Sequence, residues 1–121
     1  MKNYSIQASH YMLDFFGVDS KKLNDIKLCR KIIEDACGIA GCTILNIMEH
    51  KFEPHGLTIA CILSESHCTI HTWPESNYCA IDIYGCGDSN LKEAVDCFVA
   101  RLMPGNHSIK LVKRGDEDAN L

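Results

Sequence analysis

The chain has 121 residues, of which 46% are hydrophobic and 23% are charged, and its formal net charge is −4. This composition is ordinary for a globular protein and predicts a single domain over residues 1–121. Because the chain shows no basic cluster, no apolar run of membrane-spanning length and no signal-peptide pattern, we expect a cytoplasmic protein that binds neither nucleic acid nor membrane.

The N-terminal part is expected to form one strand and one helix. Residues 5–16 have an extended pattern, which Gly17 ends. From Asp19-Ser20, where either residue suits a helix N-cap, apolar residues recur at helical spacing. We expect this single helix to end near Gly38 and Gly41.

Strands dominate the rest of the chain. Four runs typical of strands follow the helix, over residues 43–49, 57–64, 67–73 and 78–84. Asn90, with Glu93 three residues later, predicts a capping box and a second helix as far as Leu102. A final strand is expected over residues 108–112.

This order of elements, β-α-β-β-β-β-α-β, predicts an α+β fold. We expect a two-layer sandwich in which two helices cover one face of a mostly antiparallel sheet. The other face then needs a partner, and a second copy of the chain, pairing sheet to sheet in a dimer, is the simplest candidate.

The chain contains eight cysteines, but their spacing indicates neither disulfides nor zinc. A disulfide framework suits exported, loop-rich chains, and zinc ligands usually occur in close pairs. We therefore expect most of the thiols to be small buried hydrophobic groups and no metal to be bound. The cysteines are Cys29, Cys37, Cys42, Cys61, Cys68, Cys79, Cys86 and Cys97.

Polar side chains concentrate in residues 63–75, directly after an apolar run. In an extended chain, His67, His71 and Trp73 share one face, because strand side chains alternate. Pro74 cannot donate to a sheet ladder and ends the strand. We therefore expect one face of this strand to carry the function.

Taken alone, these residues leave three kinds of chemistry open. Ser66 with a histidine and an acid could form a hydrolase site, although the chain has no Gly-x-Ser-x-Gly motif. Cys86 with His71 or His67 could form a Cys–His nucleophile pair. A metal site could be drawn from the histidines His50, His55, His67 and His71.

The longer pattern is more specific. Glu65-Ser66-His67, Ile70 to Glu75, Asp82 and Gly85-Cys86-Gly87 resemble the prokaryotic S-adenosylmethionine decarboxylases, which are small pyruvoyl enzymes of spermidine biosynthesis. The resemblance extends to His50-x-Phe52-x-Pro54-x-Gly56 and to Met12-Leu13-Asp14-Phe15. The chain departs from the family pattern at Gly85, where a threonine or similar residue is expected, and in its short acidic C-terminal tail.

The resemblance implies a self-made cofactor. The Ser66 hydroxyl would attack the Glu65 carbonyl, and elimination would split the chain into a β chain, 1–65, and an α chain, 66–121. Ser66 would become a pyruvoyl group that forms a Schiff base with the substrate amine. The resemblance assigns His71 to this processing, and Thr58 either to processing or to a purely structural place in its strand.

The remaining implied roles concern turnover of S-adenosylmethionine. Cys86 matches the proton donor of the family, with a plain core thiol as the alternative. Phe52 and Trp73 match an adenine clamp, Glu75 matches a ribose acceptor, and His67 is a further candidate for substrate binding. We expect a homodimer of cleaved α/β pairs.

Two other functions remain open at this point. The same scaffold with Ser66, His71 and Cys86 could decarboxylate ornithine or arginine, which would not need the aromatic clamp. A non-processing regulatory homologue could keep the fold, although the intact Glu65-Ser66 pair argues against it.

Overall fold

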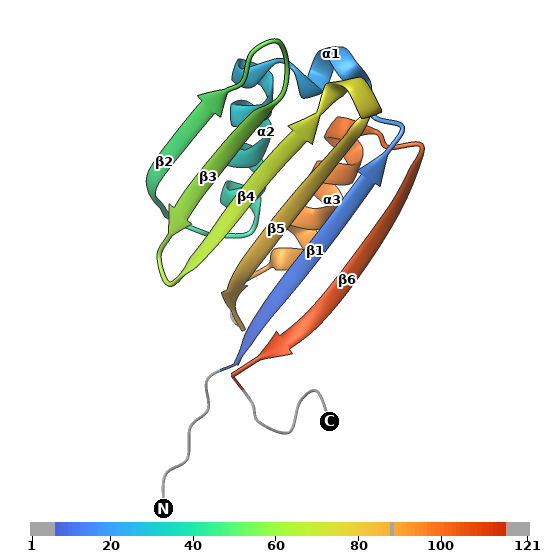
Figure 1. The fold of residues 1–121 in the computed structure, drawn as a ribbon. Helices are drawn as coiled ribbons and strands as arrows, with labels where there is room; N and C mark the ends of the chain where they lie inside the picture. Colours follow the sequence, from blue (N-terminus) through green and yellow to red (C-terminus); the bar gives the residue numbers. More distant parts are fainter. Residues whose placement is uncertain (1–6, 88, 116–121) are drawn as a thin grey trace, which may run out of the picture.

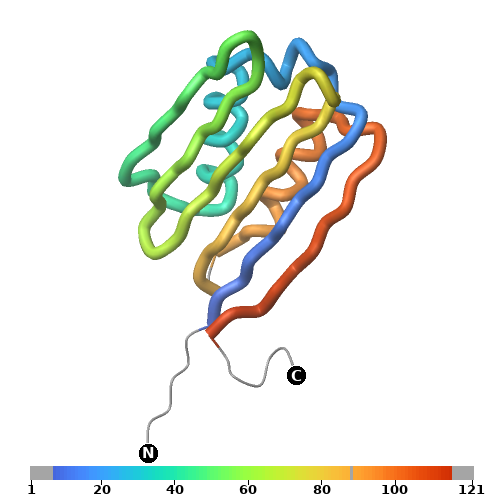
Figure 2. The backbone as a smooth tube through the Cα atoms, in the orientation of Figure 1, coloured from blue at the N-terminus to red at the C-terminus, as the bar shows by residue number. Residues whose placement is uncertain are grey.

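A computed structural model describes residues 7–87 and 89–115. Its six strands form one sheet in which every neighbouring pair is antiparallel, in the order β2-β3-β4-β5-β1-β6 (Figure 1). The strands are β1 (Ala8–Phe16), β2 (Ile44–Lys51), β3 (Leu57–Leu63), β4 (Ser66–Trp73), β5 (Tyr78–Cys86) and β6 (Asn106–Arg114). β1 lies between β5 and β6. Because the first strand, β1, is antiparallel to the last strand, β6, the described chain begins and ends at the same end of the sheet (Figure 2).

The helices α1 (Ser20–Leu23), α2 (Ile26–Ile39) and α3 (Leu91–Leu102) lie on one face of the sheet (Figure 1). They bury the inward side chains of the strands, such as Phe15, Ile59 and Ile81, together with their own Ile33 and Phe98. A short 3-10 helix, η1 (Pro74–Ser76), connects β4 to β5. The expected two-layer α+β fold is confirmed.

The expectation of one helix between residue 19 and Gly41 is wrong. The chain forms α1 and α2, and Asn24 and Asp25 separate them. Asp25 begins the second helix because its side chain accepts a hydrogen bond from the backbone N–H of Leu28, at 3.0 Å. Gly38 lies inside α2, whereas Gly41, with φ +76°, provides the left-handed turn after it.

Several other predicted boundaries are also wrong. β2 continues to Lys51 and β6 covers residues 106–114, because backbone pairing continues through residues whose side chains are polar. β5 continues to Cys86, because Gly85 and Cys86 still pair with β1. Asn90 stands at the N-cap of α3 as predicted, but its side chain makes no capping hydrogen bond. The capping box is therefore absent.

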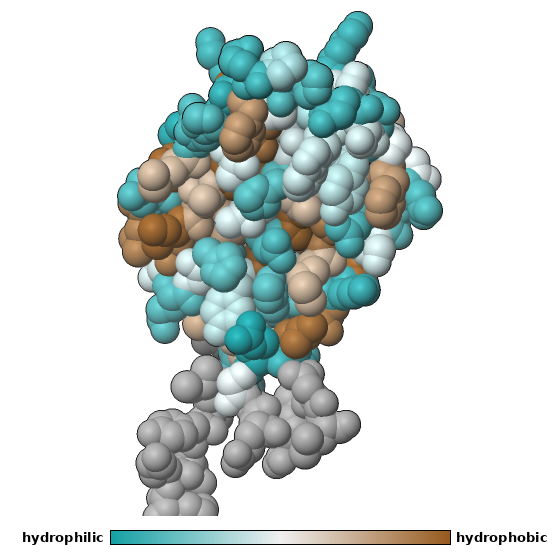
Figure 3. All heavy atoms as spheres, viewed as in Figure 1, coloured by the Kyte–Doolittle hydropathy of each residue, from teal (hydrophilic) through white to brown (hydrophobic). Residues whose placement is uncertain are grey.

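No helix among residues 7–87 and 89–115 covers the second face of the sheet, which we call the open face. Alternation along the strands sends Thr58, His71 and Asp82 to this face. Hydrophilic and hydrophobic side chains are mixed across it (Figure 3). Large apolar side chains also lie exposed here, among them Met48 at 66% and Ile62 at 53%. In the described parts of the chain, no helix is long and apolar enough to cross a membrane.

Candidate active site

The predicted cleavage point lies in the turn of a tight hairpin. Leu63 and Ser66 are the last paired residues of β3 and β4, so Ser64 and Glu65 alone make the turn. Glu65 has φ +65°, in the left-handed region. For a residue that has a Cβ atom, this backbone conformation costs roughly 1–2 kcal/mol. Glu65, directly before Ser66, is therefore sterically strained.

The thiol of Cys86 approaches this turn from the end of β5. Its Sγ donates to the carbonyl oxygen of Glu65 at 3.8 Å, a long contact that sulfur allows. The Ser66 hydroxyl donates to the carbonyl of Ser64 at 3.3 Å. The structure thus brings Glu65, Ser66 and Cys86 together, and the thiol contacts the carbonyl group that the Ser66 hydroxyl would attack.

A pocket of about 320 Å³ opens at the other end of β4. Five more of the predicted residues line it, namely Phe52, Thr58, His71, Trp73 and Glu75. The residues Phe52 and Trp73 are 46% and 43% exposed, which leaves aromatic surface free for a ligand. Exposed aromatic rings beside a carboxylate and an imidazole suit a flat, polar ligand.

Thr58 and His71 are directly opposite each other on β3 and β4. The hydroxyl of Thr58 lies 2.9 Å from Nδ1 of His71. This hydrogen bond fixes the orientation of the imidazole and leaves its Nε2 available for a proton transfer. Thr58 therefore orients His71, whether Thr58 itself takes part in processing or has only a structural place in its strand.

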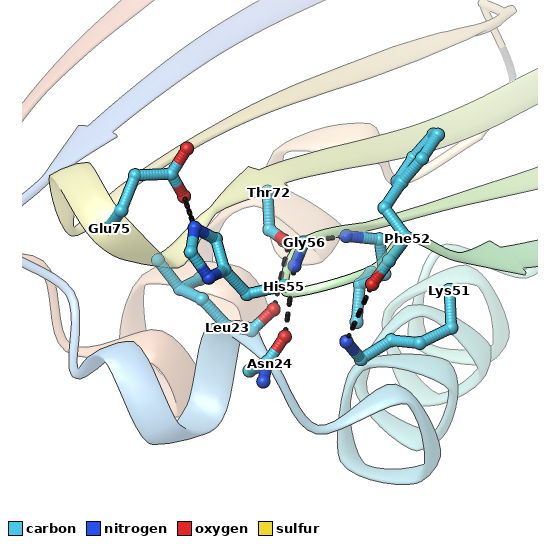
Figure 4. Close-up of polar contacts among 9 residues, drawn as sticks. Leu23, Asn24, Lys51, Phe52, His55, Gly56, Thr72 and Glu75 are labelled. Carbon is cyan, nitrogen blue, oxygen red and sulfur yellow. Dashed lines mark hydrogen bonds and ion pairs between the residues drawn. The ribbon is translucent and has the colours of Figure 1, made fainter.

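The loop that carries Phe52 is fixed at several points (Figure 4). Its ends meet where the backbone N–H of Phe52 donates to the carbonyl of Gly56 at 2.8 Å. The Gly56 N–H donates to the side chain of Asn24 at 2.9 Å. Gly56 has φ +101°, and a Cβ there would lie 3.1 Å from the carbonyl oxygen of Thr72, so only glycine fits.

The buried hydroxyl of Thr72 joins this loop to α1 (Figure 4). It accepts from the backbone N–H of Leu57 at 3.0 Å and donates to the carbonyl of Leu23 at 2.7 Å. The pocket wall is therefore a hydrogen-bonded junction of β3, β4 and α1, and its side chains start from a rigid backbone.

Tyr78 is a pocket neighbour that sequence reasoning missed. Its ring lies 5.3 Å from that of Trp73 and 5.3 Å from that of Phe16. Its hydroxyl donates to the carboxylate of Asp14 at 2.5 Å, and this hydrogen bond is the main reason why the pKa of Tyr78 rises to about 12. Tyr78 therefore stays a neutral donor that supports the back of the Trp73 ring.

A second cluster lies on the open face close to the cleavage turn, and sequence reasoning missed its members His10 and Tyr84. His67 stacks on Tyr84, with ring centres 5.5 Å apart, and Nε2 of His10 lies 3.0 Å from a carboxylate oxygen of Asp82. The rings of His10 and His67 are 6.1 Å apart. His67 therefore belongs to the cleavage end of the sheet and not to the aromatic pocket.

The predicted residues thus form two separate groups. Glu65, Ser66 and Cys86 form the cleavage group, while Phe52, Thr58, His71, Trp73 and Glu75 form the pocket group. His71 follows Ser66 by five positions on the same strand, which is roughly 17 Å at about 3.4 Å per residue. Within one chain, the structure does not bring His71 to Ser66.

The four histidines considered for a metal site are not gathered. His50 packs against Phe52 and His55 lies near Glu75, while His67 is at the far end of β4. Among residues 7–87 and 89–115, no group of three or more histidine, cysteine or acidic side chains is arranged to hold a metal ion.

Known proteins of one family resemble almost the whole described chain. A sequence profile described as S-adenosylmethionine decarboxylase matches residues 9–115. The S-adenosylmethionine decarboxylase proenzyme of Prochlorococcus marinus (strain MIT 9313) is 42% identical over 108 residues, covering 88% of this chain and 86% of that protein. The S-adenosylmethionine decarboxylase proenzyme 2 of Bacillus anthracis is 38% identical over 113 residues, covering 93% and 92%.

A solved structure agrees with these sequences. The crystal structure of the adenosylmethionine decarboxylase from Aquifex aeolicus VF5 superposes with a TM-score of 0.86 at 32% sequence identity, covering 92% of each chain.

Proposed function

Because the chain belongs to the S-adenosylmethionine decarboxylase family, we propose that it is a pyruvoyl-dependent decarboxylase of S-adenosylmethionine. It cuts itself between Glu65 and Ser66 into chains 1–65 and 66–121. Its product is the aminopropyl donor for spermidine synthesis. The observation that carries this proposal is the strained Glu65 turn, whose carbonyl oxygen contacts the Cys86 thiol.

Self-cleavage needs an activated peptide bond and a nucleophile beside it. The Ser66 oxygen attacks the Glu65 carbonyl carbon, and the chain is then joined through an ester. Removal of the Ser66 α-proton expels the Glu65 carboxylate, and hydrolysis releases ammonia and leaves the pyruvoyl group. The Cys86 thiol is placed to donate a hydrogen bond to the oxyanion of the first step.

The pyruvoyl group supplies an electrophilic ketone for the substrate amine and an electron sink for the loss of CO₂. The residues around Ser66 fit such a group, because Cys86 already lies beside this position with its thiol directed at the turn. The same thiol is placed to return a proton after CO₂ has left.

The pocket group supports a nucleoside substrate. Phe52 and Trp73 offer exposed aromatic faces on two walls of one pocket, and Glu75 adds a carboxylate at its rim. Stacking on a base is worth about 1–3 kcal/mol for each aromatic partner. A free amino acid such as ornithine or arginine would leave these faces unused.

We propose that the complete site forms between two copies of the chain. The cleavage group and the pocket group occupy opposite ends of β4, and none of the described helices covers the polar and apolar side chains of the open face. When two such faces pack about a two-fold axis that lies in the interface and runs perpendicular to β4, the cleavage group of one copy meets the pocket group of the other. This homodimer brings His71 of one copy to Ser66 of its partner.

All eight cysteines are free thiols. This supports a reducing compartment, and we place the enzyme in the cytoplasm.

Denaturing mass spectrometry of the purified protein tests the self-cleavage. We expect fragments 1–65 and 66–121, the second carrying a pyruvoyl group in place of a free amino terminus. The Ser66→Ala variant should remain a single chain of about the 13.5 kDa of the intact protein. Cleavage of this variant at the same bond would exclude the mechanism.

A comparison of substrates tests the assignment to S-adenosylmethionine. The processed protein is supplied separately with S-adenosylmethionine, ornithine and arginine, and the released CO₂ is measured. We expect turnover of the nucleoside substrate only. Turnover of an amino acid without turnover of S-adenosylmethionine would show that the aromatic pocket has another purpose.

A further inference from the structure

The loop that carries Phe52 also places a histidine against the predicted ribose acceptor. Nε2 of His55 lies 3.3 Å from Oε1 of Glu75. Figure 4 shows the imidazole reaching from the loop across to η1, where Glu75 stands. Both side chains line the aromatic pocket and also a second pocket of about 310 Å³ beside it. From the sequence, His55 was expected only as a candidate metal ligand.

His55 starts from a fixed backbone, whereas Glu75 has a flexible side chain. The residue after His55, Gly56, is held by Asn24 and by the close approach of Thr72. Glu75 lies on a single 3-10 turn, and its side chain is 47% exposed. Its carboxylate is held in place through the contact with His55. Without this contact, ordering the side chain on a ligand would cost rotamer entropy.

The geometry leaves the carboxylate able to bind a diol. A carboxylate has two oxygens and about four lone-pair positions. His55 occupies one position on Oε1, so Oε2 and the second lone pair of Oε1 remain open for two hydroxyl donors. A vicinal diol, as in a ribose ring, needs two acceptor positions side by side.

We propose that His55 is a positioning residue for ribose recognition, which holds Glu75 in the orientation that accepts the 2′- and 3′-hydroxyls of a nucleoside. This inference rests on the proposed function for the substrate class and adds a residue to it. It predicts that His55 matters only for ligands that carry the diol, and only while Glu75 is present.

Trp73 provides a direct readout, because it is the only tryptophan in the chain and lies in the same pocket as His55 and Glu75. Quenching of its fluorescence is used to titrate the purified protein with adenosine and, separately, with 2′-deoxyadenosine. His55→Ala should weaken adenosine binding roughly three- to tenfold, the range expected for one hydrogen bond. Binding of 2′-deoxyadenosine should change much less, whereas a damaged pocket would weaken both ligands equally.

Two further variants isolate the contact. His55→Gln retains a side-chain N–H donor and should restore most of the adenosine affinity. In the Glu75→Ala background, His55→Ala should cause no additional loss, because the group that it positions is gone. His107→Ala on β6 is the matched control for the substitution itself and should bind like the original protein.

Steady-state kinetics with S-adenosylmethionine completes the test. His55→Ala should raise KM by a similar factor and leave kcat and self-cleavage unchanged, as for a contact made equally in the ground and transition states. Equal adenosine affinities in the original protein and in His55→Ala would overturn the inference, as would equal losses for both nucleosides. The proposed function would fail differently, through a chain that stays uncleaved or does not release CO₂.

Discussion

Glu65 shows how a single backbone conformation can serve a reaction. Of the two turn residues between β3 and β4, only Glu65 has a positive φ, and a charged side chain stands where glycine would be free of strain. Strain of this kind persists where the surrounding structure enforces it. Here the paired strands on both sides enforce it, directly before the bond that the mechanism cuts.

Replacing Glu65 with glycine should relax this turn. In the Ser66→Ala background, where the chain stays intact, Glu65→Gly should leave stability unchanged or raise it by up to about 1 kcal/mol, measured by denaturant unfolding. In the chain that retains Ser66, the same change should lengthen the half-time of self-cleavage on a denaturing gel. Faster cleavage in the glycine variant would show that strain at Glu65 does not promote the reaction.

For individual residues, the sequence supplied the candidates for the site but not the contacts that they make. The motif supplied Ser66, Cys86 and His71, but the contact between Cys86 and the Glu65 carbonyl depends on where β5 ends. The pair of His55 and Glu75 was missed because a loop and a 3-10 turn bring the two residues together. Strand register and loop paths create such pairs, and no local pattern encodes them.

Among the helices and strands, hydrophobic periodicity was sufficient to identify most of the elements. It failed at Asn24 and Asp25, because Leu23 and Ile26 keep an apparent helical spacing across the break and are both packed into or against the core. The Asp25 cap was the available signal, since aspartate before an apolar run favours a helix start. The strand ends were predicted wrongly because backbone pairing with the neighbouring strands, and not the local sequence, determines where a strand ends.

The two long helices are joined by a small ion-pair network. Asp35 of α2 lies 2.8 Å from Arg101 of α3 and 3.0 Å from Lys31 on its own helix. The hydrogen bonds from Arg101 and then Lys31 lower the pKa of the Asp35 carboxyl below its ordinary value. The ion pairs therefore stabilise the fold above that ordinary pKa, and this contribution is lost as pH falls through the folded-state pKa.

Asp35→Asn should consequently make the stability of the folded state depend less strongly on pH. We expect the midpoint of thermal unfolding to be slightly lower than in the unchanged chain at neutral pH, and the difference to shrink below about pH 4, the range in which aspartate is normally protonated. The measurement is a series of melting curves in the Ser66→Ala background. A difference that grows toward acid pH would contradict the assignment.

In the proposed dimer, the open face determines how the site is completed. The sequence indicated that one sheet face lacks a cover, because only two long helices were available for a sheet of this size. It did not reveal that the proposed catalytic residues divide between the two ends of β4, since alternation indicates the face on which a side chain lies and not how far apart two residues are along the strand. The distance between Ser66 and His71 became clear only from the folded strand.

Two defective chains should repair each other if the site is shared between copies. Ser66→Ala and His71→Ala should each stay uncleaved when expressed alone. In an equal mixture, about half of the His71→Ala chains pair with a Ser66→Ala chain, which supplies the missing imidazole. Mass spectrometry should then detect fragments of the His71→Ala chain. An uncleaved mixture, with mixed dimers shown to be present, would place the complete site within one chain.

The interleaved strand order has a consequence for how the protein can refold. After the proposed cleavage, the first fragment would hold β1, β2 and β3 and the second would hold β4, β5 and β6, yet β1 would remain between β5 and β6. The fragments therefore share three strand boundaries and stay together through the ladders β3–β4, β5–β1 and β1–β6. Folding of the precursor is a reaction of one molecule, whereas refolding of the mature pair requires a collision between two. The proposed self-cleavage would thus change the molecularity of folding, so that the mature subunit, once unfolded and diluted, would regain its structure at a rate set by its concentration.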